Sequence, residues 1–235
     1  MRLVVPPGVF RPPTDTYMLI DALREQTLPP RASVLDVCTG SGALAIAAAL
    51  RGAREISAVD VSRRAVLTAR LNGRLNGVRI RVRRGDLFAP FARSRFDAIL
   101  SNPPYVPASD DEHTPRGLQR AWAAGPDGRV FIDRLCREAP EHLRPGGFLL
   151  LVQSTLIGEH ETLEMLREGG LEAETVLRRR GELGPLMSAR VHALEQRGIL
   201  RAGERHEDVI VVRGRRPARA DTPPPDRAAA VRAAG

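Results

Sequence analysis

The tetrapeptide Asn102-Pro103-Pro104-Tyr105 carries the side chains most able to do chemistry, and it follows an apolar run, 96–101, that is typical of a buried strand. The two prolines fix φ and remove two backbone N–H donors, so they hold the Asn102 amide rigid. An amide oxygen and a backbone carbonyl can together accept both hydrogens of a planar NH2 group, and Tyr105 can lie against its flat face. The tetrapeptide predicts recognition of an amide or base amine, with an ordinary proline-rich turn as the alternative.

A second candidate site begins in the run Ser33-Val34-Leu35-Asp36-Val37-Cys38-Thr39-Gly40-Ser41-Gly42. A short apolar strand leads there into a glycine-containing turn and then into an alanine-rich helix at 43–50. Strand, turn and helix in this order form the first unit of a nucleotide-binding α/β sheet. Gly40 and Gly42 would let the backbone approach a ligand and the helix approach the strand.

Two further acids follow predicted strands. Asp60 lies about 20 residues beyond the glycine turn, the spacing of a carboxylate that binds ribose hydroxyls. Asp86 follows the strand predicted at 78–83 and could accept a hydrogen bond from an adenine amine, with Leu87 giving a backbone N–H. Each acid could instead be a solvated turn residue. Together with Asp36, however, they end three successive strands, which favours a ligand site.

These motifs resemble those of class I S-adenosylmethionine-dependent methyltransferases, and specifically the HemK/PrmC family, which methylates glutamine in release factors. The flanking segments Val9-Phe10-Arg11-Pro12-Pro13-Thr14-Asp15-Thr16-Tyr17 and Ala121-Trp122-Ala123-Ala124-Gly125-Pro126-Asp127-Gly128-Arg129 are similar to the short branch without a separate N-terminal helical domain. In eukaryotes and archaea that branch works with a small zinc-binding activator protein. The resemblance covers about residues 5 to 180, but adenine and guanine methyltransferases share the tetrapeptide.

The resemblance implies a role for each candidate residue. Asn102 and the Pro103 carbonyl would accept the substrate NH2 hydrogens, with Tyr105 as the third catalytic residue and Pro104 completing the substrate contacts. The cofactor would be bound by Thr16, Asp36, Cys38, Gly40, Gly42, Asp60, Asp86, Leu87 and Asn102. No general base is named, because His113 and His142 lie in polar stretches typical of solvated imidazoles.

The chain departs from the family at two places. Cys38 stands where the family usually has a glycine, so its backbone must avoid positive φ or accept strain of about 1–3 kcal/mol. The segment 178–207 is longer than expected, and 186–194 within it predicts an inserted amphipathic helix.

Alternating strands and helices predict an α/β fold with a mostly parallel seven-stranded sheet and helices on both faces. Family resemblance adds an antiparallel last strand. We expect an N-terminal arm and helix at 1–30, with a cap at Thr14 or Asp15, a methyltransferase domain at 31–214, and a disordered, basic Pro/Ala-rich tail at 215–235.

Composition excludes several classes of protein. The 235 residues are 43% hydrophobic, enough for one sizeable core. No apolar run is long enough for a membrane span, and Pro6 and Pro7 interrupt any secretory signal, which predicts a cytoplasmic protein. Cys38 and Cys136 are too few for a disulfide framework or a zinc site, so we expect reduced, buried thiols and no metal. The net charge of +8 comes from arginine alone and could contact RNA or an acidic protein.

Three functions are consistent with these residues. The first is a protein glutamine methyltransferase acting on a release factor or another translation protein, with or without an activator subunit. The second is a nucleic-acid methyltransferase acting on an exocyclic base amine such as that of adenine; against it, no separate target-recognition domain is visible to assist base flipping. The third is a cofactor-binding subunit without its own catalysis, which the intact acids and tetrapeptide argue against.

Overall fold

The computed structural model describes residues 1–108, 119 and 121–218. Its centre is one seven-stranded sheet in the order β3-β2-β1-β4-β5-β7-β6. The strands are β1 Ser33–Val37, β2 Glu55–Asp60, β3 Ile80–Arg84, β4 Phe96–Ser101, β5 Leu143–Ser154, β6 Glu172–Glu182 and β7 His206–Arg215. The first five run parallel, whereas β7 is antiparallel to both β5 and β6. The predicted mostly parallel sheet with an antiparallel last strand is confirmed.

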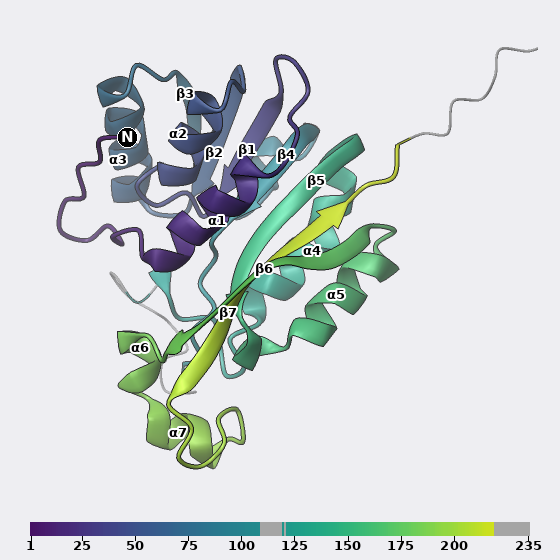
Figure 1. Ribbon diagram of the computed structural model, residues 1–235. Helices are drawn as coiled ribbons and strands as arrows, with labels where there is room; N and C mark the ends of the chain where they lie inside the picture. The colour runs from purple at the N-terminus through teal and green to yellow at the C-terminus, as the bar shows by residue number, and fades with distance from the viewer. Residues whose placement is uncertain (109–118, 120, 219–235) are drawn as a thin grey trace, which may run out of the picture.

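Helices cover both faces of this sheet (Figure 1). The helices α1 Thr14–Arg24, α2 Ala43–Leu50 and α3 Arg63–Leu75 pack on one face, and α4 Val130–His142 and α5 Glu159–Glu168 pack on the other. The central strand β1 is buried on both sides for this reason. Leu35 and Val37 belong to the core under α4 and α5, while the preceding Val34 belongs to the core under the first three helices.

The N-terminal arm lies along α3 and is tied to it by two asparagines. Asn72, which is fully buried, accepts from Val4 N at 2.8 Å and donates from Nδ2 to Val4 O and Ser41 O at 2.9 Å. Asn76 Oδ1 accepts from Arg2 N at 2.8 Å. The predicted cap of the first helix at Thr14 or Asp15 is wrong, because the capping residue is Pro13 and it makes no side-chain bond.

The segment between β6 and β7 contains two short helices, α6 Pro185–Ser188 and α7 Val191–Gln196, instead of the single predicted helix. Ala189 and Arg190 form a turn between the two helices. Their N–H groups donate the last main-chain hydrogen bonds of α6, to Pro185 O and Met187 O, and α7 begins at Val191. Figure 1 shows both helices at the end of the long β6–β7 pair, away from α5.

Two predicted surface features are ordered parts of the fold. The His142 imidazole, expected to be solvated, is 8% exposed, stacks on Phe88 with ring centroids 4.5 Å apart, and contacts Ser94 O through Nδ1 at 3.0 Å. His113 lies outside the described residues. Arg215, predicted as the first residue of a disordered tail, is instead the last residue of β7, and Arg216 Nη1 donates to Leu143 O at 2.8 Å. Residues 219–235 lie outside the described part.

Candidate cofactor and substrate site

The loop between β1 and α2 is held from below by the buried carboxylate of Asp36. Its Oδ2 accepts hydrogen bonds from Thr39 Oγ1 at 2.6 Å and Ala45 N at 3.0 Å. Oδ1 is also buried and has no hydrogen-bond partner among the described residues. Burial raises the pKa of the Asp36 carboxyl to about 7, and the nearby Asp60 charge acts in the same direction. Asp36 therefore fixes the loop at a cost in desolvation.

Three residues of this loop have positive φ: Cys38 at 60°, Gly40 at 53° and Gly42 at 86°. Cys38 thus adopts the left-handed conformation that glycine would adopt without strain. Its thiol is half-buried, in contrast to the buried thiol that we predicted, whereas Cys136 is buried as expected. A Cβ at Gly40 would meet no atom within 4 Å, whereas one at Gly42 would lie 3.1 Å from Ala69 Cα. Gly42 is therefore needed for the close approach of α3, whereas the absence of a side chain at Gly40 leaves empty space beside the loop.

Asp60, at the end of β2, connects two loops. Its Oδ2 accepts from Gly40 N at 2.9 Å, and its Oδ1 accepts from Ser62 N at 2.9 Å, just before α3. Burial raises the pKa of Asp60, and these two backbone hydrogen bonds oppose that rise. Each carboxylate oxygen keeps a second lone pair, so the side chain can still accept from a ligand hydroxyl.

A cavity of about 470 Å³ opens above the carboxyl ends of β1, β2, β3 and β4. We refer to it as the first cavity. Of the candidate cofactor residues, it is lined by Thr16, Cys38, Gly40, Asp60, Asp86, Leu87 and Asn102. Asp36 and Gly42 lie behind its wall. The N-terminal arm contributes the wall residues Gly8, Val9 and Phe10.

Asp86 lies at the edge of the first cavity and is already engaged by a cation. Arg134 on α4 contacts both of its oxygens, at 3.2 Å from Nη1 and 2.9 Å from Nη2. Half of the Asp86 side chain remains exposed, which leaves room for a further donor. Leu87 is buried with φ at 39°, an unusual angle for a branched residue.

The Asn102 side chain is oriented by Thr16 from α1. The amide Nδ2 donates to Thr16 Oγ1 at 3.0 Å, although the two residues are 86 positions apart. This bond occupies the nitrogen end of the amide and leaves the oxygen as the group available to a ligand. Thr16, predicted to contact the cofactor, thus also positions Asn102.

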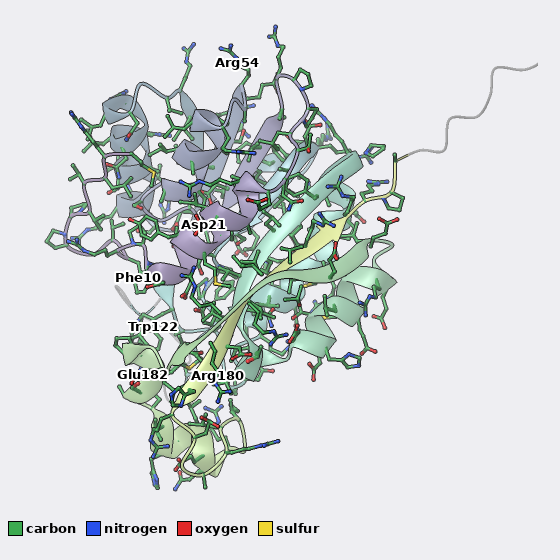
Figure 2. The ribbon with its side chains drawn as sticks, viewed as in Figure 1. Phe10, Asp21, Arg54, Trp122, Arg180 and Glu182 are labelled. Carbon is green, nitrogen blue, oxygen red and sulfur yellow. The ribbon has the colours of Figure 1, made fainter. Side chains whose placement is uncertain are left out.

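A second cavity, of about 570 Å³, lies beyond Asn102. All four residues of the tetrapeptide line it, and it shares Phe10, Pro13, Asn102, Pro104 and Ala121 with the first cavity. Its far wall is formed by the end of β6, by α6 and by Glu207 on β7. Figure 2 shows four of its lining residues, Phe10, Trp122, Arg180 and Glu182, gathered between the start of α1 and the end of β6. Asn102 therefore stands at the junction of two cavities.

The tetrapeptide is fixed by both flanking motifs. The Tyr105 hydroxyl donates to Asp15 Oδ2 of α1, and burial raises the pKa of both groups. Val106 N donates to Trp122 O at 2.9 Å, and a Cβ on Gly128 would lie 2.5 Å from Tyr105 O. Only a glycine allows the 121–129 segment to approach so closely.

Several lining residues were not predicted as site residues. Phe10 and Ala121 lie within the flanking motifs, so their position there was the available signal. Glu207 and the residues of α6 had no such signal, because 183–205 separates the two strands that bring them to the cavity.

A doubly wound sheet with a glycine loop after β1 and acids after β2 and β3 defines a nucleotide-cofactor enzyme with its ligands at the carboxyl ends of the strands. Residues 1–120 match the model of the methyltransferase small domain family. The chain is 37% identical over 174 residues to the Methanocaldococcus jannaschii protein named "Putative protein N5-glutamine methyltransferase MJ0928", covering 74% of this chain and 86% of that protein.

It is also 37% identical over 173 residues to the release factor glutamine methyltransferase of Geobacter sulfurreducens, covering 69% of this chain but only 58% of that longer protein. The solved E. cuniculi Mtq2-Trm112 complex, at 24% identity and a TM-score of 0.60, covers 89% of this chain and 99% of the solved chain, and it shares the fold. The chain therefore belongs to the methyltransferase small domain family and is a HemK/PrmC-like class I enzyme with S-adenosylmethionine as its cofactor.

The first cavity fits that cofactor. Carboxylates of Asp60 and Asp86 line it at the ends of adjacent strands, where a nucleoside offers hydroxyl and amine donors. The backbone at Gly40 faces open space that a side chain would fill. Within the described ranges no group of three His, Cys, Asp or Glu residues could hold a metal ion, and none of the helices described there has the length and apolar character of a membrane span.

Proposed function

We propose that this protein transfers a methyl group from S-adenosylmethionine to the side-chain amide nitrogen of a glutamine in a protein, most simply a peptide chain release factor. The observation that carries the proposal is the position of Asn102, whose oriented amide lies in the wall common to both cavities. A substrate amide in the second cavity would face the first cavity across this residue. The names of the two relatives support glutamine as the acceptor.

In this proposal, Asp60 binds the ribose hydroxyls, while Asp86 and the Leu87 N–H bind the adenine. Cys38 and Gly40 contribute the loop backbone. Thr16 acts mainly by orienting Asn102, and Asp36 and Gly42 act by shaping the loop, because neither lines the first cavity.

The bound cofactor supplies a methyl group activated by a sulfonium. In-line displacement requires the attacking nitrogen, the methyl carbon and the sulfur to lie on one line. An amide nitrogen is a weak nucleophile because resonance delocalises its lone pair. Asn102 Oδ1 and the Pro103 carbonyl would accept its two N–H hydrogens and increase the electron density on nitrogen. The N–C bond would form as the methyl C–S bond breaks, with the neutral thioether as the leaving group. The methylated nitrogen, now acidic, would then lose its proton to water, so no general base is needed.

Tyr105 has a positioning role in this scheme. Its hydroxyl is committed to Asp15, so the ring and not the hydroxyl is offered to the substrate amide. The contact also links the tetrapeptide to α1, which carries Thr16. Both ends of the substrate-binding turn are thereby attached to the same helix.

The experiment that tests the proposal is a labelled-methyl assay on cell lysate, with separate protease and nuclease treatments. We expect the label in protein, on glutamine, and unaffected by nuclease; the Asn102→Ala variant should not incorporate it. Label in nucleic acid would support the alternative, an exocyclic base amine, for which Arg179 and Arg180 at the second cavity would be the phosphate contacts. If neither protein nor nucleic acid is labelled, the result would support the third function, a cofactor-binding subunit without its own catalysis.

We further propose that a small activator subunit binds the exposed face of α3, and that the assembly acts in the cytoplasm. Leu67, Leu71 and Leu75 are spaced four residues apart on this helix and are 60%, 45% and 48% exposed. Such a stripe is unusual on a surface that stays in water. The Mtq2 structure was solved as a complex with Trm112, which supports a partner. Co-purification of a small protein with the wild type, but not with Leu71→Glu, would test it.

A further inference from the structure

The second cavity contains a carboxylate oxygen that the fold leaves unused. Glu207, the second residue of β7, lines this cavity and is only 8% exposed. Its Oε1 accepts a hydrogen bond from Gly184 N, the residue that precedes α6, at 3.0 Å. Its Oε2 is buried and has no hydrogen-bond partner in the described part of the chain. A buried acceptor without a donor is costly, so such a group indicates a ligand.

The Tyr105 hydroxyl, which belongs to the same cavity, does not donate to this oxygen. Tyr105 is close enough for the Glu207 charge to raise the pKa of its phenol, after the larger effects of burial and of Asp15. Its single O–H, however, is donated to Asp15. The second cavity is therefore lined by one carboxylate that accepts from Tyr105, Asp15, and by another, Glu207, with one buried oxygen that has no donor among the described residues.

Resting on the proposed function, we infer that Glu207 is a substrate-binding residue whose Oε2 accepts a hydrogen bond from a backbone N–H of the segment that carries the target glutamine. Only Oε2 lacks a donor, since Oε1 already accepts from Gly184 N. A single N–H can fill this one position, whereas a bidentate arginine would need both carboxylate oxygens. The charged residues lining this cavity are three acids, Asp15, Glu182 and Glu207, and two arginines, Arg179 and Arg180. The excess of acids favours a protein segment over the phosphates of nucleic acid.

The direct test is Glu207→Gln. This variant keeps an oxygen for Gly184 N and replaces the open acceptor by an NH2 group. Because hydrogen bonds to charged groups are among the stronger ones, we expect the KM for a glutamine peptide from a release factor to rise by about 10- to 100-fold. Cofactor affinity, measured by calorimetry, should stay unchanged. A KM within about threefold of the wild type in a folded variant would overturn the inference.

Asp208→Asn is the matched control. Asp208 is the next residue of the same strand, faces the other side, and pairs at the surface with Arg178 at 3.1 Å. It removes the same charge without touching the second cavity, so the KM should not change. An equal rise in KM in both variants would mean that net charge is responsible and would contradict a contact at Glu207.

A panel of peptides, each N-methylated at one backbone amide beside the glutamine, identifies the donor. The wild type should lose affinity for one of them by a factor similar to that of the mutation, and Glu207→Gln should lose nothing more with that peptide. If every N-methylated peptide binds the wild type with normal affinity, the inference is wrong. It is also wrong if affinity falls only in a further peptide whose lysine side chain has been replaced, because Glu207 would then bind a side-chain charge and not a backbone N–H. The wild-type panel decides the question even if the variant fails to fold. Absence of methylation of any peptide by the wild type would instead refute the proposed function.

Discussion

The two cavities that meet at Asn102 are built in different ways. The first is formed by loops at the carboxyl ends of four neighbouring parallel strands, and backbone groups such as Gly40 N are held by the acid of the next strand. The second is formed by side chains from α1, from the segment 121–122, from α6 and from β7, which are far apart in the sequence. The first arrangement follows the general rule for ligand sites of open α/β sheets, whereas the second depends on contacts between segments that are distant in the sequence.

Asn102 tests the comparison most severely, since it belongs to both cavities. Asn102→Ala should lower turnover by about 100-fold or more, the usual loss when a preorganised polar contact to a reacting group is removed. Cofactor affinity should be largely unchanged. Single-turnover kinetics together with calorimetry measure the two effects. Near-normal methylation of both glutamine peptides and adenine-containing nucleic acid would show that the tetrapeptide is a structural turn.

Asp60 tests the first cavity alone. Asp60→Ala should weaken cofactor binding by about 2–3 kcal/mol, because it removes charge-assisted hydrogen bonds to ligand hydroxyls and frees the Gly40 and Ser62 amides. Calorimetric titration measures the loss. Asp21→Ala, which removes an exposed ion pair with Arg24 outside both cavities, is the control. Unchanged affinity in a folded Asp60 variant would reduce this acid to a turn residue.

The Asp36→Asn variant tests whether the buried carboxylate that holds the β1–α2 loop lowers the stability of the protein when it is charged. Its pKa is raised from 3.8 to about 7, so the folded state holds the proton more tightly than the unfolded state does. Stability from this group is present below pH 4 and is lost as the pH rises to 7. The unfolding free energy of Asp36→Asn relative to the wild type should therefore increase across that window, by on the order of 3 kcal/mol. Urea denaturation at pH 4, 5.5 and 7 checks this; a constant difference would contradict it.

Thr16 gives the smallest expected effect. Thr16→Val removes the acceptor for Asn102 Nδ2 and keeps the shape of the side chain. A single neutral hydrogen bond is worth about 0.5–1.5 kcal/mol, which corresponds to a two- to tenfold fall in turnover. The variant Thr175→Val, which removes a hydroxyl hydrogen bond to Glu159 outside both cavities, serves as the comparison. Equal turnover in the wild type and Thr16→Val would show that proline rigidity alone orients Asn102.

Prediction from sequence succeeded where the chain repeats a local rule. The strand at 96–101 was predicted with the bounds that the structure gives it, because a buried parallel strand is a continuous apolar run ending in a turn. It failed where tertiary contacts override local polarity. His142 lies in a polar stretch but stacks on Phe88, and the predicted 186–194 helix is divided in two.

The sequence by itself determined the mostly parallel sheet, because the positions of the glycine loop and the acids reflect strand length and backbone geometry. Through the family resemblance of its motifs it also determined the cofactor, and it proposed the tetrapeptide as the reacting turn. The tertiary structure decided what those residues contact. It placed Asp36 and Gly42 behind the wall, attached Asn102 to Thr16 across 86 positions, and brought Glu207 to the second cavity. Contacts of this kind depend on how distant helices and strands pack, and no local pattern in the chain encodes them.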